Sequence, residues 1–237
     1  MRLHNTKAHT VVISPSEPAV CESLEAQEIS VIHSQCIPQL RNNEQYHADI
    51  QLCIVNENAF VPDDNKSIVN IAEKFGYNVI LCKPLGGKYP DNIALNVAMI
   101  NGKLYCKESA VAEEIKTYCK SRGIEIINVN QGYTKCSTLI LNNRAIITAD
   151  ETIHIAAEKN GIDVLRIEPG NIYLEGADYG FIGGCSGVIG DTVYFFGDIN
   201  THPEAEPIIS FIRKQGMNYI SLTQGIMKDI GGFICLK

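Results

Sequence analysis

Long apolar segments are missing from this sequence. No stretch approaches the roughly 18 consecutive apolar residues of a membrane-spanning helix. Residues 1–7 also lack the apolar core of a signal peptide. The sequence therefore predicts neither a membrane protein nor a secreted one, and we expect a cytoplasmic location.

Basic clusters are missing as well. Lys and Arg are scattered along the chain, and the net charge is -7. A protein that wraps nucleic acid or docks on an anionic membrane needs a concentrated positive surface. Neither nucleic acid nor a membrane is therefore predicted as a partner, and the oligomeric state stays open.

Cysteine pairs of the C-x-x-C type are absent, although the chain has nine cysteines. The odd number and the spacing predict neither a disulfide framework nor a zinc site. No His, Asp and Glu cluster shows ligand spacing either, so we predict no metal and no other cofactor. Most of the thiols are expected to be small buried hydrophobic groups.

What remains is the composition of an ordinary globular protein. The chain is 45% hydrophobic and 20% charged, and it has no low-complexity tract. No linker or boundary is visible. We therefore predict a single domain over residues 1–237.

A helix-to-strand pattern recurs along the chain. Gly76, Gly123, Gly161 and Gly216 each end an amphipathic segment and precede a short run rich in β-branched residues. Glycine adopts the left-handed conformation that ends helices, so each glycine predicts a helix followed by a strand. A fifth run lacks the glycine. The predicted strands are 26–32, 77–81, 124–127, 162–167 and 217–222.

A predicted hairpin precedes each helix. Four hairpins are complete, with polar turns at 56–58, 101–102, 142–143 and 190–191. The fifth is split, because residues 233–236 would have to pair with residues 10–13. The predicted helix starts are Ser16, Asp64 or Asn65, Ser109, Asp150 and Thr201.

The register of aromatic residues indicates a ring. His47, Tyr89, Tyr133 and Tyr179 stand just before the four complete hairpins, 42, 44 and 46 residues apart (89−47, 133−89 and 179−133). A regular period of this size is typical of an array of like units. Because the terminal half-units complete each other, we predict an α/β fold of five ββαβ units, a pseudo-fivefold αβ-propeller closed by the terminal strands. An open doubly wound sheet is the alternative, but it lacks the antiparallel pair of each unit.

This arrangement resembles the pentein fold. Guanidino-group-modifying enzymes share that fold, among them arginine and agmatine deiminases and dimethylarginine dimethylaminohydrolase, and so does a non-enzymatic ribosome anti-association factor. The resemblance covers essentially the whole chain as architecture. For the enzymes it implies a cysteine nucleophile, a histidine acid/base and carboxylates that hold the guanidinium.

Two residues match that set. Residues 231–236, Gly-Gly-Phe-Ile-Cys-Leu, look like the glycine-glycine-x-x-cysteine stretch that carries the agmatine deiminase nucleophile, which implies Cys235 as the nucleophile. Asp49 falls near the position of a substrate-binding carboxylate. Where a second acidic residue is expected, the chain has Asn92 and Asn96.

The family's histidine has no counterpart at its expected position. Residues 132–136 are Gly-Tyr-Thr-Lys-Cys there, and tyrosine is a poor proton donor and acceptor near neutral pH. His47 and Asp49 imitate the family's H-x-D pattern in another unit. His47 is therefore the candidate acid/base, on the expectation that the units converge at the ring axis.

Each candidate also has a structural interpretation. Cys235 would fill the core, and His47 would pack as the aligned tyrosines do. The segment 183–187, Gly-Gly-Cys-Ser-Gly, predicts either an anion-binding nest or a close approach of backbones. Cys136 is a further candidate thiol, because the adjacent Lys135 would lower its pKa.

The converging strand ends predict one ligand pocket at the axis. Its expected lining is His47, Asp49, Tyr89, Asn92, Tyr133, Lys135, Tyr179, Cys185 and Cys235. Two functions stay open. The first is a cysteine-dependent hydrolase or deiminase of a guanidine or related C-N substrate, with Cys235 as nucleophile. The second is a non-catalytic pentein that binds a small molecule or, like the ribosome factor, a macromolecule.

Overall fold

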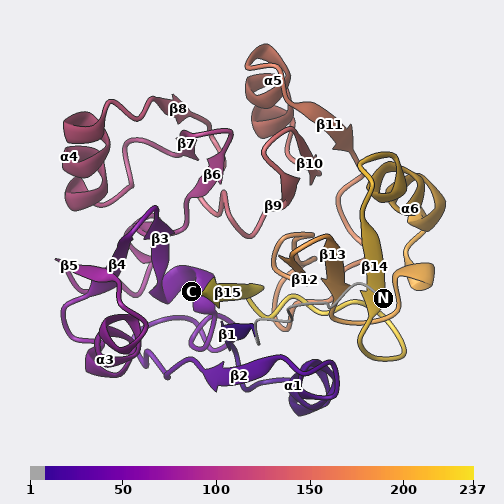
Figure 1. Ribbon diagram of the computed structural model, residues 1–237, viewed down its shortest axis with the longest axis horizontal. Helices are drawn as coiled ribbons and strands as arrows, with labels where there is room; N and C mark the ends of the chain where they lie inside the picture. Colours follow the sequence, from indigo (N-terminus) through magenta and orange to yellow (C-terminus); the bar gives the residue numbers. More distant parts are fainter. Residues whose placement is uncertain (1–8) are drawn as a thin grey trace, which may run out of the picture.

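Five three-stranded sheets surround a common axis in the computed structural model, which describes residues 9–237 (Figure 1). In each sheet the middle strand pairs antiparallel with the inner strand and parallel with the outer one. The predicted ring of five ββαβ units is therefore confirmed. The predicted absence of a signal peptide concerns residues 1–7, which lie outside the described residues. None of the helices in the described part is long and apolar enough to cross a membrane.

The split unit closes the ring. Its elements are β15 (Phe233–Leu236), β1 (Thr10–Ile13), α1 (Pro18–Glu25) and β2 (Ser30–His33). Thr10 pairs with Leu236 and Ile13 pairs with Phe233. The two ends of the described chain are thus held in one sheet, as predicted.

The other four units follow in chain order. Unit 2 comprises α2 (Ala48–Gln51), β3 (Cys53–Val55), β4 (Asn58–Pro62), α3 (Lys66–Lys74) and β5 (Asn78–Cys82). Unit 3 comprises η1 (Asp91–Ile93), β6 (Ala98–Ile100), β7 (Lys103–Cys106), α4 (Glu113–Arg122) and β8 (Ile126–Asn128). Unit 4 comprises β9 (Thr138–Asn142), β10 (Ala145–Thr148), α5 (Glu151–Lys159) and β11 (Asp163–Arg166). Unit 5 comprises β12 (Ser186–Ile189), β13 (Thr192–Phe195), η2 (Ile199–Thr201), α6 (Ala205–Lys214) and β14 (Asn218–Ser221).

Two predicted helix starts are confirmed by their capping bonds. The side chain of Asn65 accepts a hydrogen bond from the Ile68 N–H at 3.2 Å, and Asp150 accepts one from the Ile153 N–H at 2.9 Å. Each bond satisfies an N–H group that has no partner within its helix.

Three predicted starts are wrong. The Ser109 start fails because residues 107–111 form a turn of their own, and α4 begins at Glu113. The Thr201 start fails because Thr201 ends η2, while α6 begins four residues later. At α1 the residue before the helix is Glu17 rather than Ser16, with Pro18 in the first position.

A non-glycine residue replaces the helix-ending glycine in the split unit. The four predicted glycines all have positive φ angles, between 65° and 76°, and Glu28 has a φ of 62°. The Glu28 N–H donates to the Glu25 carbonyl at 2.9 Å, as the Gly76 N–H donates to the Glu73 carbonyl at 2.9 Å. The fifth unit therefore ends its helix in the same way without a glycine.

The hydrophobic core is divided among the interfaces between neighbouring units of the ring, which are called seams below. Five clusters of buried hydrophobic side chains are found in the described residues, and each joins two neighbouring units. The middle strands supply both seams, because successive side chains point to opposite faces. In β10, Ala145 and Ile147 contact unit 5, whereas Ile146 contacts unit 3.

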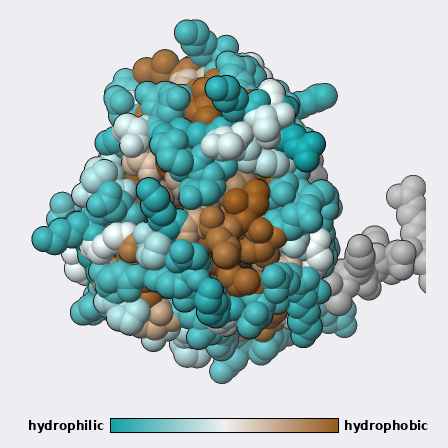
Figure 2. Space-filling model, turned by 90° about the vertical axis from the view of Figure 1, so that its left-hand side faces the viewer, coloured by the Kyte–Doolittle hydropathy of each residue, from teal (hydrophilic) through white to brown (hydrophobic). Residues whose placement is uncertain are grey.

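The helices cover the outside of the ring, and the inner strands surround its axis (Figure 1). Figure 2 shows the side of the molecule that carries α4 and β5, where a large central hydrophobic patch and some smaller ones interrupt a mainly hydrophilic surface. Leu81 at the end of β5 is among the exposed large hydrophobic residues. The polar groups that could carry chemistry are found instead near the axis.

Candidate functional site

Two separate pockets lie near the ring axis. One has a volume of about 170 Å³ and is called the Glu44 pocket here; the other has about 190 Å³ and is called the Cys235 pocket. Asp49 lines the Cys235 pocket and Cys136 lines the Glu44 pocket. Because the side chains of these two residues are hydrogen-bonded to each other, they lie between the two pockets.

A buried thiol, imidazole and carboxylate meet at this point. The Cys136 thiol donates a hydrogen bond to Asp49 Oδ2 at 2.8 Å. One ligand atom each of His47, Asp49 and Cys136 lies within 4.8 Å of the other two. Their exposed fractions are 4%, 1% and 2%. Cys136 therefore has both a proton acceptor and an imidazole nearby.

Short helical turns before the inner strands position these groups. His47 precedes α2, and Asp49 stands in its first turn. Cys136 lies in the turn before β9, where the Ser137 N–H donates to the Tyr133 carbonyl at 2.9 Å. The site thus joins unit 2 to unit 4 at the axis.

Asn96 of unit 3 fixes the thiol from the other side. Its Oδ1 accepts hydrogen bonds from the N–H groups of Lys135 at 2.8 Å and Cys136 at 3.3 Å. Its Nδ2 lies 3.2 Å from Cys136 Sγ and donates to the Asp49 carbonyl at 3.2 Å. Asn96 stands where the resemblance implied a substrate-binding carboxylate. In this structure its side chain instead holds Lys135, Cys136 and Asp49 in place.

Burial controls the protonation of the pair. It raises the pKa of Asp49 to about 6, against the positive charges of His47 and Lys135, which lower it. Burial also raises the pKa of Cys136 well above its ordinary value, and the negative charges of Asp49 and Asp229 raise it further. The resting thiol is therefore protonated, and its activation requires a base or a bound cation.

Asp229 is a second buried carboxylate beside His47. It accepts hydrogen bonds from the N–H groups of Phe181 at 2.8 Å and Gly231 at 3.0 Å. Burial raises its pKa, and the positive charge of His47 lowers it. Asp229 stands four residues before Phe233, as Asp49 stands four before Cys53 (233−229 and 53−49).

The glycines of segment 183–187 allow backbones and side chains to approach closely. A Cβ atom at Gly184 would collide with the Asp229 carboxylate, and one at Gly183 would meet the carbonyl oxygens of Lys135 and Cys136 at 2.5 and 2.7 Å. Of the two readings of this segment, the structure supports close packing.

Glu44 gives the Glu44 pocket a further carboxylate. Its Oε1 accepts a hydrogen bond from the Tyr133 hydroxyl at 2.8 Å, and its Oε2 accepts one from Asn92 Nδ2 at 2.8 Å. Asn92 also donates to the Tyr133 hydroxyl at 2.7 Å. The pocket is lined by Arg41, Asn43, Glu44, His47, Tyr133, Cys136, Leu174, Ala177, Tyr179, Phe181 and Asp229.

The predicted nucleophile Cys235 lies in the other pocket. Its thiol donates to the Val188 carbonyl at 3.4 Å, and burial raises its pKa to about 11, while the positive charge of Lys135 lowers it. Asp49 and Lys135 line this pocket too, among mainly apolar side chains. His47 lines the Glu44 pocket instead.

The remaining predicted residues are dispersed. Tyr89 is 41% exposed and its ring stacks on Tyr133 at 6.1 Å. Tyr179 is 40% exposed at the edge of the Glu44 pocket. Cys185 is buried in the hydrophobic cluster between units 4 and 5, where its thiol donates to the Ile182 carbonyl at 3.4 Å.

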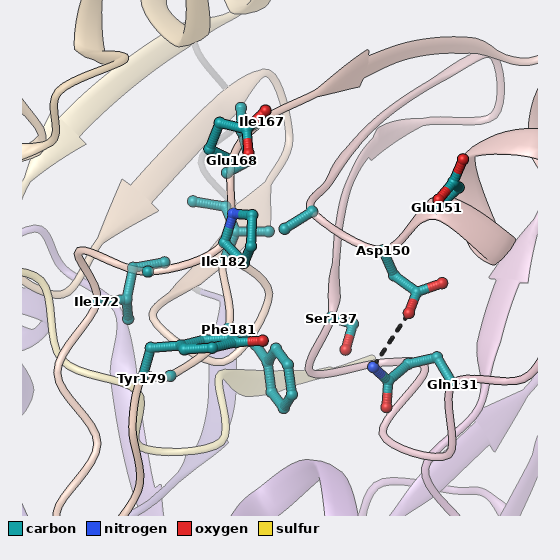
Figure 3. Close-up of a pocket in the computed structure, with 14 residues that line it drawn as sticks. Gln131, Ser137, Asp150, Glu151, Ile167, Glu168, Ile172, Tyr179, Phe181 and Ile182 are labelled. Atoms are coloured by element: carbon teal, nitrogen blue, oxygen red, sulfur yellow. Dashed lines mark hydrogen bonds between the residues drawn. The ribbon is translucent and has the colours of Figure 1, made fainter.

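A third pocket, of about 130 Å³, adjoins this site (Figure 3). Tyr179 and Phe181 line it on one side, and Asp150 lies across from them. The Asp150 carboxylate already accepts hydrogen bonds from Gln131 at 3.2 Å and from the N–H of Ile153 at 2.9 Å. Neither a thiol nor an imidazole of the described residues lines this pocket, so it does not contain the cluster of His47, Asp49 and Cys136.

Sequence reasoning missed Glu44 and Asp229. Asp229 could have been found from its distance to the inner strand, which repeats that of Asp49. Glu44 carries no such signal, because its partners Asn92 and Tyr133 come from units 3 and 4.

Comparisons with known proteins identify the fold. A search of curated proteins finds no match. Residues 11–234 match the model of a family of unknown function, DUF6873. Dimethylarginine dimethylaminohydrolase from Pseudomonas aeruginosa, in complex with citrulline, is similar with a TM-score of 0.56 at 11% identity, over 94% of this chain and 95% of that one.

Two further solved structures are similar over most of their length. C. jejuni agmatine deiminase has a TM-score of 0.55 at 13% identity, over 91% of this chain and 86% of that one. An amidinotransferase of the saxitoxin pathway from Microseira wollei has a TM-score of 0.55 at 10% identity, over 94% and 89%. The predicted pentein fold is therefore confirmed.

Proposed function

Because this chain belongs to the DUF6873 family, whose function is unknown, we propose a function from its site: the protein binds a small guanidinium- or amidinium-type cation in the Glu44 pocket and attacks its central carbon with Cys136. The observation that carries the proposal is the meeting of the Cys136 thiol with His47 and Asp49 within 4.8 Å. The similar solved structures include a dimethylaminohydrolase, a deiminase and an amidinotransferase, which agrees with this chemistry.

The cation is suggested by the charges of the pocket. Glu44 and Asp229 are buried carboxylates that line it, and a planar cation pairs well with carboxylates in two-point contacts. Tyr133 and Phe181 add aromatic rings, which favour cations over their faces. Arg41 is exposed at the rim.

The bound cation would also activate the nucleophile. The pKa of Cys136 is raised partly by the charges of Asp49 and Asp229. A positive charge placed next to the thiol opposes that effect and favours the thiolate. The thiol would therefore ionise mainly when substrate is present.

The reaction would proceed in two steps. In the first, Cys136 Sγ bonds to the central carbon, the C–N bond to the departing amine breaks, and His47 carries the thiol proton to that amine. In the second, water attacks the thiouronium carbon and the C–S bond breaks; one proton of the water returns to the sulfur through His47, and the other leaves on the departed amine, which is released as an ammonium ion. One water is consumed, and a urea-type product leaves.

This proposal moves the nucleophile from Cys235 to Cys136. The reason is that Cys136 shares a pocket with His47, whereas Cys235 lines the other pocket. Attack at the central carbon requires the thiol and the proton carrier to reach one substrate.

Ligand binding without turnover is the second candidate function. It is favoured by the protonated resting state of Cys136, since a thiol is a much weaker nucleophile than a thiolate. Glu44 and Asp229 would hold the cation in this case as well.

A small chloro-substituted amidine separates these functions. The Cys36→Ser variant is the suitable background, because Cys36 is the exposed thiol. We expect one covalent adduct by intact mass, lost on adding Cys136→Ser and retained on adding Cys235→Ser. If the adduct is lost in the Cys235→Ser variant and kept in the Cys136→Ser variant, Cys235 is the nucleophile. Binding of free guanidines with no adduct in any variant would support the second candidate.

A further inference from the structure

We propose that His47, Asp49 and Cys136 form a binding site for a divalent transition-metal ion, with Zn²⁺ as the best match. This inference does not depend on the proposed function. It rests on the identity of the three groups, on their distances and on an unsatisfied atom of Asp49.

The three groups are of the kinds that bind zinc. Zinc is bound by cysteine sulfur, histidine nitrogen and carboxylate oxygen at about 2.0–2.3 Å, which places neighbouring ligands of a tetrahedron about 3.5 Å apart. Here the three atoms lie within 4.8 Å of one another, and Cys136 Sγ is 2.8 Å from Asp49 Oδ2. Shifts of about 1 Å therefore complete the geometry.

Asp49 Oδ1 is the second observation. The atom is buried and has no hydrogen-bond partner among residues 9–237. Asp49 as a whole is 1% exposed. A buried carboxylate oxygen without a partner is costly, because it has given up its bonds to water. A metal ion between the three side chains would supply the missing interaction.

Charge and surroundings fit a divalent ion. The thiol proton is released when Zn²⁺ bonds to Cys136 Sγ, so the ion is neutralised by one thiolate and one carboxylate. Asn96 Nδ2 lies 3.2 Å from the same sulfur and keeps it oriented. Cys136 and His47 line the Glu44 pocket, which leaves room for a water as the fourth ligand.

Metal binding competes with thiol attack. A sulfur bonded to Zn²⁺ shares one of its electron pairs with the ion, which makes it a weaker nucleophile than the free thiolate, so the ion would slow covalent chemistry. The inference therefore adds a regulatory ligand of the site, whether or not the thiol turns over a substrate.

Calorimetric titration of the reduced, metal-free full chain with ZnCl₂ tests the site. We expect one ion to bind per chain. Cys136→Ser and Asp49→Asn should each lower the affinity for Zn²⁺ by more than about 100-fold, because the loss of a residue that only orients a metal ligand usually costs about 10–100-fold. Cys36→Ser and Cys235→Ser are matched controls that should keep the wild-type affinity. Thermal melts identify any variant that fails to fold.

Cobalt gives a second readout. Co²⁺ bound to the reduced chain should show the near-ultraviolet band of thiolate-to-metal charge transfer, lost in Cys136→Ser and kept in Cys235→Ser. The proposal is overturned if the wild-type chain binds no stoichiometric Zn²⁺, or if Cys136→Ser and Asp49→Asn, both folded, bind it as the wild type does. The amidine adduct is measured without metal, so failure of one proposal leaves the other testable.

Discussion

The Cys136 thiol is 2.8 Å from Asp49 Oδ2, although 87 positions separate the two residues in the sequence. They come from units 2 and 4, which are not neighbours along the ring. Their contact therefore depends on the correct closure of all five units. The same holds for Glu44 and Tyr133, whose side chains are 2.8 Å apart.

Removing the Tyr133 hydroxyl should weaken this connection across the axis. In Tyr133→Phe, Glu44 loses a hydrogen bond, and a bond to a charged group is worth about 2 kcal/mol. We expect the free energy of unfolding to fall by about that amount in urea titrations. Tyr179→Phe is the control, because Tyr179 is 40% exposed and its hydroxyl can bind water; equal losses in both variants would contradict the role of Glu44.

Replacing Glu28 by glycine should stabilise the protein. Glu28 has a φ of 62°, a left-handed conformation that costs an L-residue about 1 kcal/mol and glycine almost nothing. Denaturant unfolding of Glu28→Gly should show a gain of about 1 kcal/mol. The control is Glu22→Gly within α1, which should lose about 1 kcal/mol. A loss in Glu28→Gly would mean that its side chain contributes more than its backbone costs.

His202 should make the protein less stable as the pH falls. Burial lowers the pKa of His202 from its usual value, and the negative charge of Glu204 opposes the shift. Its Nδ1 accepts a hydrogen bond from the Glu204 N–H at 3.1 Å, which the neutral ring alone can do. The unfolded chain takes up this proton more readily than the folded one. The contribution of neutral His202 to the free energy of unfolding is therefore complete above the unfolded pKa of about 6.5 and is lost as the pH falls below it.

The measurement is the melting temperature of wild type and His202→Asn between about pH 7.5 and 5.5, a window around the unfolded histidine pKa. The asparagine keeps an acceptor for the Glu204 N–H but takes up no proton, so its melting temperature should fall less. His33→Gln, at the exposed end of β2, is the control and should follow the wild type. Identical slopes for wild type and His202→Asn would exclude His202 as the cause.

Asn43 should hold two loops together beside the Glu44 pocket. Its Nδ2 donates to the Glu175 carbonyl at 2.7 Å, and Asn43 and Leu174 both line the pocket. In Asn43→Ala we expect faster amide hydrogen exchange over residues 173–177, with a change of less than about 0.5 kcal/mol in global stability. Asn42→Ala next to it should leave the exchange unchanged. Unaltered exchange in Asn43→Ala would show that other contacts hold the loop.

The ring was predictable because its signals are local. Glycines such as Gly123 end helices through their own backbone conformation, and polar turns such as 101–102 close hairpins within a few residues. The split unit followed from the same pattern, since 233–236 and 10–13 each lacked a partner arm. The wrong starts at Ser109 and Thr201 arose where a separate turn took the place of the first helical turn.

The site was only partly predictable because its contacts cross units. His47 and Asp49 were recognised from a pattern within one segment, but their partner Cys136 lies in another unit. The resemblance to the agmatine deiminase segment favoured Cys235, because Cys235 follows the glycine pair at 231–232. In the structure the imidazole lines the pocket of Cys136. No spacing rule along one chain reveals which of nine cysteines meets which histidine.

The pairing of β1 with β15 can form only at the end of translation. Ile13 is opposite Phe233, 220 residues later (233−13), so β1 leaves the ribosome long before its antiparallel partner exists. At the usual elongation rates of about 5–20 residues per second, the wait is about 10–40 s. Throughout that time one edge of β1 has unpaired backbone N–H and C=O groups, which are open to pairing with strands of other chains.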